Sequence, residues 1–336
     1  MKYLLTGGAG FIGSHLAEEL LRNEHEVCVI DDLSTGQIDN IQHFKHMRRF
    51  RYVLESVMDR QVMAELVDDA DVILHLAAAV GVQLVVDNPV HTIETNIKGT
   101  ETVLALASKK KKRVVVFSTS EAYGKSMRAK FSETDDLVLG PTTRGRWCYA
   151  ASKIIDEFLA LAYYKERKLP VTIVRLFNTV GPRQTGRYGM VIPRFVGQAL
   201  TEQPITVYGN GRQIRTFTHV RDAVRGILGL AECDAAIGEV FNIGGKETIS
   251  IGDLAKRVKT LLSSSSPIVY IPYEDAYGEG FEDMEKRVPD ISKIGGLIGF
   301  EPTLSLDQTI YDVAAYQRER MPAVATIDTR KTPLPV

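Results

Sequence analysis

The stretch Thr6-Gly7-Gly8-Ala9-Gly10-Phe11-Ile12-Gly13 follows an apolar run at the start of the chain and leads into an amphipathic segment that ends at Arg22. This order predicts a strand, a tight turn and a helix. Gly7 permits the turn, Gly10 lets the backbone approach a diphosphate, and Gly13 lets the helix pack on the strand. The helix N-terminus then faces the anion. The stretch is therefore typical of a dinucleotide site, and the alternative is a purely structural glycine turn.

A carboxylate after the second apolar run supports the dinucleotide interpretation. Residues 27–30 are apolar and end in Asp31, about twenty residues after the turn, where a carboxylate can bind a ribose diol. A 2′-phosphate placed there would meet a like charge, so NAD is favoured over NADP. Asp32 either binds the cofactor or caps the following loop. The expected cofactor-binding residues are Gly7, Gly10, Phe11, Ile12, Asp31, Asp32, Ser34, Thr35, Gly36, Leu76, Ala77, Ala78, Tyr149 and Lys153.

Strand-like apolar runs alternate with helical patterns through the first half of the chain. The expected strands are residues 2–6, 27–31, 50–54, 71–76, 113–118 and 170–176. The expected helices are residues 13–22, 60–67, 90–108 and 149–167. This alternation predicts an α/β fold, a Rossmann-type doubly wound parallel sheet with helices on both faces.

The sequence pattern changes after Phe177, where prolines and glycines separate shorter expected elements. We expect a large cofactor-binding unit over residues 1–177, which the segment at about 217–244 rejoins. A smaller C-terminal substrate-binding lobe is expected over residues 178–216 and 245–320. The proline-containing tail, residues 321–336, has few large apolar side chains and is expected to be disordered.

Composition excludes several classes of function. The 336 residues include 41 Lys and Arg against 42 Asp and Glu, so charge gives no reason to expect nucleic acid or an anionic membrane as a partner. Three scattered cysteines are too few for a disulfide framework and show no metal-ligand spacing, which indicates reduced thiols, no metal and a cytoplasmic protein. No apolar run approaches membrane-spanning length.

Tyr149 and Lys153 carry the strongest chemical signal. They are four residues apart, hence on one face of a helix. A lysine there can lower the pKa of the phenol, which gives a tyrosinate able to remove a proton from a sugar hydroxyl as hydride leaves its carbon. The run from Ser118 to Glu121 lies at the end of an expected strand and offers hydroxyls for a substrate oxygen and one carboxylate. Alternatively, Ser118 and Thr119 only cap that strand.

Together these motifs resemble the extended short-chain dehydrogenase/reductase family of nucleotide-sugar enzymes, over about residues 1–318. The resemblance implies NAD as the cofactor and a UDP-sugar as the substrate. It depends on the glycine turn, Asp31, His75-Leu76-Ala77-Ala78, the run from Ser118 to Gly124, the Tyr149 and Lys153 pair, the run from Arg175 to Arg183, and Val207-Tyr208-Gly209-Asn210-Gly211.

The reaction is indicated by the residues that follow Thr119. Dehydratases of this family usually carry Asp-Glu there, and epimerases usually have a small residue where Glu121 stands. The Thr-Ser-Glu combination looks like that of UDP-glucuronate decarboxylases. A distant segment, Tyr277 to Ile291, resembles the one in which those enzymes place a catalytic arginine, here Arg287. A structural alternative makes Arg287 a surface ion-pair partner of Glu282 or Asp283.

The resemblance implies a role for each catalytic residue. Tyr149 acts as base and later as acid at O4, while Lys153 keeps its pKa low and binds the nicotinamide ribose. Thr119 and Ser120 orient the sugar oxygens. Glu121 and Arg287 handle the carboxylate and the proton that returns to C5, so that UDP-xylose or a 4-keto-pentose is formed.

Two other functions stay open at this point. The first is a UDP-hexose or UDP-glucuronate 4-epimerase, because Glu121 and Arg287 could bind a carboxylate that is retained. The second is a catalytically silent NAD-binding protein on the same fold.

The resemblance also implies a substrate site and an assembly. The substrate-binding residues it implies are Asn178, Val191, Val207, Tyr208, Arg215 and Arg287. A homodimer would form through a four-helix bundle from the helices at about 90–108 and 149–167, unless their apolar faces pack only within the monomer. The adenine contacts stay open, because Ser56-Val57, followed by Asp59, stands where the family often has an acidic residue before an aliphatic one.

Overall fold

A seven-stranded parallel sheet forms the centre of the computed structural model, which describes the chain except for residues 82–84, 86, 186–189, 278–281 and 322–336. The strand order is β11-β6-β5-β4-β1-β2-β3. These strands are β1 (Lys2–Thr6), β2 (Glu26–Ile30), β3 (Phe50–Val53), β4 (Val72–His75), β5 (Arg113–Thr119), β6 (Val171–Leu176) and β11 (Val240–Ile243). The order reverses between β1 and β4, where a doubly wound sheet opens a crevice at its carboxyl edge. The predicted fold class is confirmed, and β11 pairs with β6, as expected for the segment at 217–244.

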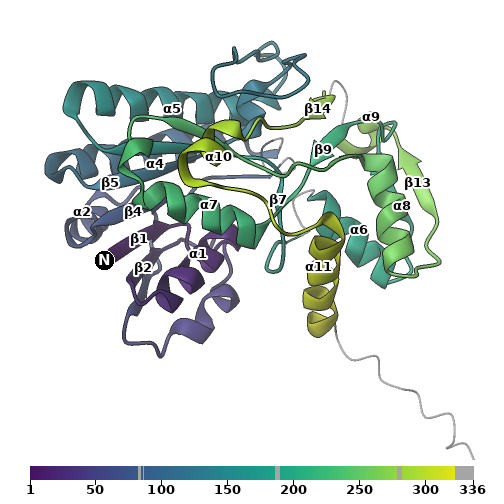
Figure 1. Cartoon of the computed structure of the whole chain (residues 1–336), viewed down its shortest axis with the longest axis horizontal. Helices are drawn as coiled ribbons and strands as arrows, with labels where there is room; N and C mark the ends of the chain where they lie inside the picture. Colours follow the sequence, from purple (N-terminus) through teal and green to yellow (C-terminus); the bar gives the residue numbers. More distant parts are fainter. Residues whose placement is uncertain (82–84, 86, 186–189, 278–281, 322–336) are drawn as a thin grey trace, which may run out of the picture.

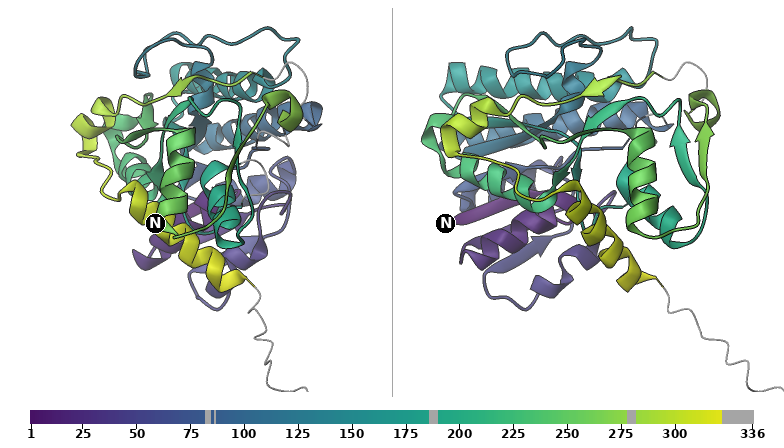
Figure 2. Two further views of the ribbon diagram at one scale, coloured as in Figure 1. Left: turned by 90° about the vertical axis from the view of Figure 1, so that its right-hand side faces the viewer. Right: turned by 45° about the vertical axis from the view of Figure 1, so that its right-hand side comes forward.

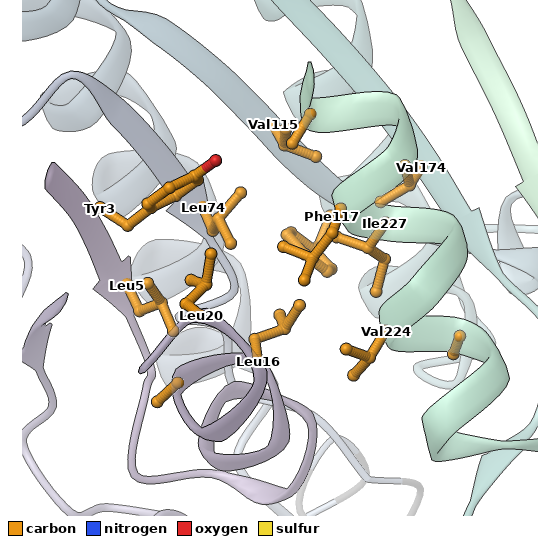
Figure 3. Close-up of a cluster of buried hydrophobic side chains, with 14 of the residues drawn as sticks. Tyr3, Leu5, Leu16, Leu20, Leu74, Val115, Phe117, Val174, Val224 and Ile227 are labelled. Atoms are coloured by element: carbon orange, nitrogen blue, oxygen red, sulfur yellow. The ribbon is translucent and has the colours of Figure 1, made fainter. Parts of the chain in front are cut away.

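Helices cover both faces of the sheet (Figure 1). One face packs on α1 (Phe11–Arg22) and α7 (Val220–Glu232), and the other packs on α2 (Arg60–Asp69), α4 (Pro89–Lys110) and α5 (Trp147–Arg167). Side chains alternate along each strand, so that Tyr3 and Leu5 enter the first core while Leu4 enters the second. Figure 3 shows the first core, where Leu16 and Leu20 of α1 face the sheet beside Ile227 of α7.

Local contacts explain the glycine turn and the start of α2. Gly7 has φ of +70°, which favours glycine, and a Cβ on Gly13 would lie 2.5 Å from the Gly7 carbonyl oxygen. At α2, the Asp59 carboxylate accepts hydrogen bonds from the backbone N–H groups of Gln61 and Val62. Asp59 therefore serves as the N-cap of this helix.

The smaller lobe has its own core and lies at one side of the sheet (Figure 2). Its elements are α6 (Val191–Leu200), β8 (Ile205–Tyr208), β9 (Ile214–Thr216), β12 (Thr248–Ser250), α8 (Ile251–Leu261), β13 (Ile268–Ile271), α9 (Tyr273–Tyr277), β14 (Lys286–Arg287) and α11 (Leu306–Arg320). The short parallel pair of β7 (Thr179–Val180) and β10 (Thr218–His219) joins the lobes. Single 3-10 turns are η1 (Ile38–Asn40), η2 (Gln42–Phe44), η3 (Ser120–Tyr123) and η4 (Asp234–Ala236).

One helix departs from the expected division of the chain. Residues 245–320 were expected in the smaller lobe, but α10 (Ser292–Ile298) packs against α7 and β11. Ile294 and, just after the helix, Phe300 belong to the core of the large unit, because their apolar side chains fill the space beside α7. The tail expected to be disordered lies outside the described residues, Met321 excepted. In the part of the chain that is described, no helix combines the length and apolarity needed to cross a membrane.

Candidate active site

A cavity of about 460 Å³ lies where the carboxyl edge of the sheet meets the smaller lobe. Its walls come from the glycine turn, the ends of β2, β4 and β5, the start of α5, and the smaller lobe. The crevice predicted by the strand order and the residues of the sequence motifs therefore meet in one place.

The cofactor end of the cavity gathers almost all the residues expected there. Its lining includes Gly7, Gly10, Phe11, Ile12, Asp31, Asp32, Ser34, Thr35, Leu76, Ala77 and Ala78. Gly36 lies behind Asp31, and a Cβ on Gly36 would stand 2.7 Å from the carboxylate. Ser56 and Val57 also line the cavity, whereas Asp59 caps α2.

The backbone here fits a dinucleotide. A Cβ on Gly7 would lie 2.9 Å from the Ala77 nitrogen, so a side chain would fill this cradle. Among the described residues no side chain caps α1, which leaves its first N–H groups for an anion. Asp31 is held by the N–H groups of Ala9 and Leu33, each at 2.9 Å, and its burial raises its pKa. Asp32 lines the cavity and also accepts a hydrogen bond from the Ser34 N–H at 2.9 Å, so both expected roles are compatible with its position.

Thr119, Tyr149 and Lys153 come together at the other end of the same cavity. Burial raises the pKa of Tyr149, and the negative charge of Glu121 adds to this, while Arg287 and a hydrogen bond with Thr119 oppose it. The Lys153 ammonium donates to the Asp156 carboxylate at 2.7 Å, and both groups are buried. Its expected effect on the phenol therefore stays a prediction.

Arg287 joins the residues that follow β5. Its Nε and Nη2 lie 3.1 and 2.7 Å from the Ser120 hydroxyl oxygen, and its Nη1 lies 3.4 Å from a Glu121 carboxylate oxygen. Its side chain is 13% exposed, and burial lowers its pKa to about 10. Arg287 is therefore not a surface partner of Glu282 or Asp283. Ser120 was expected to orient sugar oxygens, but it is fully buried and is not among the lining residues of the cavity, since its hydroxyl accepts hydrogen bonds from Arg287 instead.

Arg146, which was not among the expected site residues, lies beside this group. Its guanidinium is only 6% exposed and lies 3.6 Å from Glu121 and 2.9 Å from Asp283. It also stacks over the Trp147 ring, 4.9 Å from the ring centroid, and donates to the Glu282 carbonyl oxygen. The signal available in the sequence was its position three residues before Tyr149, and in the structure Arg146 is the N-cap residue of α5.

Asp283 was also missed, and it links the catalytic end to the smaller lobe. Its carboxylate accepts from Arg146 and Arg215, each at 2.9 Å, and from the Tyr273 hydroxyl at 3.0 Å. Although burial opposes ionisation, the charges of Arg215 and Arg146 hold the pKa of Asp283 below its ordinary value. Because Arg146 and Arg215 are 137 and 68 residues away from Asp283, only the fold reveals these two pairings.

Most of the expected substrate residues line the cavity. These are Asn178, Val191, Tyr208, Arg215 and Arg287. The guanidinium of Arg194 lies over the Tyr208 ring, with its central carbon 3.8 Å from the ring centroid. Val207 does not belong with them, because side chains alternate along β8. Val207 and Ile205 enter the core of the smaller lobe, while Tyr208 points the other way.

The glycine turn with Asp31, and the Thr119, Tyr149 and Lys153 group facing it, define the site of an extended short-chain dehydrogenase/reductase. The chain belongs to this family of nucleotide-sugar enzymes, since the family model described as GDP-mannose 4,6 dehydratase matches residues 4–313.

Several curated relatives match nearly the whole chain. The chain is 42% identical over 317 residues to the UDP-N-acetyl-alpha-D-glucosaminuronate decarboxylase of Bacillus cytotoxicus, covering 94% of this chain and 97% of that protein. It is 33% identical to UDP-glucuronic acid decarboxylase 1 of Xenopus tropicalis, covering 95% of this chain and 73% of that protein. Among solved structures, the UDP-glucuronic acid 4-epimerase of Bacillus cereus, in complex with UDP-glucuronic acid and NAD, superposes with a TM-score of 0.86. It is 31% identical, covering 95% of this chain and all of that chain.

Proposed function

We propose that this protein is an NAD-dependent decarboxylase of UDP-glucuronate or a closely related UDP-hexuronate. The observation that carries the proposal is the contact of Arg287 with Ser120 and Glu121, in the same cavity as Tyr149. A cation there can bind a sugar carboxylate next to the group that acts at O4. The names of the curated relatives support the same reaction.

The residues present can divide the reaction between them. The nicotinamide of bound NAD supplies a reversible hydride acceptor for C4. Tyr149 takes the O4 proton and later returns it, while the Thr119 hydroxyl orients the sugar oxygen. The resulting β-keto acid loses CO₂ when the bond from C5 to the carboxyl carbon breaks and its electron pair forms an enolate with the C4 ketone. Arg287 holds the carboxylate before this bond breaks. Glu121, which lies beside Arg287, takes part in the return of a proton to C5.

The substituent at C2 of the sugar distinguishes two candidate substrates. Identity is 42% to the relative named for the N-acetylglucosaminuronate and 33–35% to relatives named for the glucuronate, which favours the 2-acetamido sugar. The test is to incubate the protein with NAD⁺ and each UDP-sugar separately and to follow the products by NMR and mass spectrometry. Loss of CO₂ from either sugar supports the proposal, and the ratio of kcat/KM values identifies the preferred one.

A 4-epimerase is the second candidate. The solved UDP-glucuronic acid 4-epimerase favours it, because that protein shares the fold over nearly the whole chain. The same incubation separates the two. An unchanged mass with an inverted C4 would establish the epimerase, and no conversion of either sugar would reject both functions.

The assembly proposed for this enzyme is a cytoplasmic homodimer through α4 and α5. Large apolar side chains are exposed on both helices, among them Val90 at 69% and Phe158 at 70%. Covering them with the same helices of a second copy would remove apolar surface from water. Light scattering of the wild type and of Phe158→Asp tests this, with a dimer that becomes a monomer as the expected result and a monomeric wild type as the contrary one.

A further inference from the structure

A buried carboxylate lies directly behind the catalytic lysine. Asp156 is three residues after Lys153, one turn along α5, and their side chains are 0% and 3% exposed. The ammonium nitrogen lies 2.7 Å from the Asp156 carboxylate. In the described structure, the charge that is expected to act on Tyr149 is therefore paired with a carboxylate on its own helix.

Buried polar groups of neighbouring elements surround this carboxylate, and among the described residues its Oδ1 atom has no hydrogen-bond partner. Burial raises the pKa of Asp156, and the charge of Glu157 on the same helix adds to this, while Lys153 and a hydrogen bond with Thr100 of α4 favour its charged form. The Thr100 hydroxyl oxygen lies 3.1 Å from Nε2 of His75 in β4. The other ring nitrogen of His75, Nδ1, lies 2.8 Å from the Thr6 hydroxyl oxygen. A row of buried polar groups thus runs from the sheet to Lys153.

The remaining charges that face the Tyr149 phenol come from other elements. Glu121 of η3 raises its pKa, and Arg287 of β14 lowers it, after the larger effect of burial. Asp156 raises it further. His75 is uncharged near neutral pH because burial lowers its pKa to about 3. Asp156 is thus the carboxylate of this set that contacts the lysine itself.

We propose that Asp156 is a positioning residue for Lys153, which fixes the ammonium on α5 and sets how much of its charge acts on Tyr149. An ammonium has three donors, so Lys153 can keep this bond while it donates toward the cavity. The inference rests on the proposed function in treating Tyr149 as the base. Its test needs no sugar substrate.

The experiment is an NMR titration of the NAD-loaded protein labelled with carbon-13 at the tyrosine ζ carbon. The signal missing from Tyr149→Phe identifies Tyr149. Asp156→Asn removes one negative charge at nearly constant shape, so the pKa of Tyr149 should fall by about one unit. Groups seven residues apart on a helix are about 10 Å apart, and a unit charge at that distance has about this effect at an effective dielectric of about 20.

Control variants separate this role from simple destabilisation. Asp222→Asn removes another buried helix carboxylate, on α7, which binds Thr303 and Arg225 instead of the lysine, and it should leave the Tyr149 titration unchanged. Asp156→Glu restores a carboxylate and should return the pKa toward the wild-type value. If Asp156→Asn does not fold, Asp156→Ser removes the same charge.

The outcomes are distinct. A fall in the Tyr149 pKa that is larger with Lys153 present than in a Lys153→Met background supports the inference. An equal fall in both backgrounds shows only the direct charge effect of Asp156 and overturns it, as does an unchanged or higher pKa. If the larger fall with Lys153 present occurs but no UDP-hexuronate is converted, the proposed function fails while the positioning role stands.

Discussion

Replacing Arg287 with alanine should abolish most decarboxylation while leaving the fold and the cofactor end of the cavity intact. The guanidinium contacts Ser120 and Glu121 and faces the cavity, where a sugar carboxylate would be its charged partner. A hydrogen bond to a charged group contributes about 1.5–3 kcal/mol. Loss of about 3 kcal/mol from the transition state for CO₂ loss slows that step by about 150-fold.

The stability of this variant should change little. Breaking a buried ion pair costs about 3–5 kcal/mol when the remaining charge has no partner. Here Glu121 keeps Arg146 at 3.6 Å, and burial already disfavours the charge of Arg287, as its lowered pKa shows. We therefore expect a loss in the free energy of unfolding that is well below this pair-breaking value of about 3–5 kcal/mol.

The assay compares initial rates of CO₂ release and thermal unfolding for the wild type, Arg287→Ala and Arg287→Lys. Arg212→Ala, at an exposed arginine of the same lobe, is the matched control. Lysine should restore part of the rate, because it keeps the charge but loses the planar fork. An Arg287→Ala variant with full decarboxylation would refute the assignment of the carboxylate to this arginine.

Three further variants test other parts of the structure. His75 has a pKa of about 3 in the folded protein against an ordinary 6.5, so below about pH 6.5 the unfolded chain binds a proton that the folded one does not. The free energy of unfolding therefore falls as pH falls, and this group accounts for about 2 kcal/mol of the loss at about pH 5. Urea unfolding of His75→Gln should show a shallower dependence of stability on pH than the wild type. The same pH dependence in both proteins would contradict this. Asp31→Asn removes the charge that opposes a 2′-phosphate, so calorimetric Kd values should show the preference for NAD over NADP falling by about tenfold or more, and an unchanged preference would reject this role for the carboxylate. Arg146→Gln removes a buried cation that Glu121 and Asp283 share. Thermal unfolding should show a loss of stability of about 2 kcal/mol, and the KM for the UDP-sugar should rise. Wild-type values for both would show that these ion pairs of Arg146 are unimportant.

The fold of the large unit could be predicted from the sequence because local patterns determine its strands and its glycine turn. Alternating apolar positions, as in Tyr3, Leu4 and Leu5, fix both faces of a strand, and the glycine turn has few conformations open to it. Residues at the carboxyl ends of parallel strands must meet at one edge. For this reason the order of the strands and motifs along the chain is enough to place the cofactor residues and Thr119 together.

The expected site residues were wrong or incomplete where tertiary contacts determine which way a side chain points. Val207 was assigned to the substrate from its motif, but the alternation of β8 turns it into the lobe core and leaves Tyr208 at the cavity. Arg146 and Asp283 are 137 residues apart, so their ion pair has no local signature. Asp156 follows Lys153 by one turn, yet only the buried packing of α4 against α5 shows that it faces the ammonium rather than solvent.

The reaction itself is tested most directly by following the carboxyl carbon of the substrate. The protein is incubated with NAD⁺ and UDP-glucuronate, or UDP-N-acetylglucosaminuronate, labelled with carbon-13 at that carbon. We expect the label to leave as CO₂ in step with the appearance of a UDP-pentose or UDP-4-keto-pentose. A label that stays in a UDP-sugar of unchanged mass, with C4 inverted, would contradict decarboxylation as the function of this site.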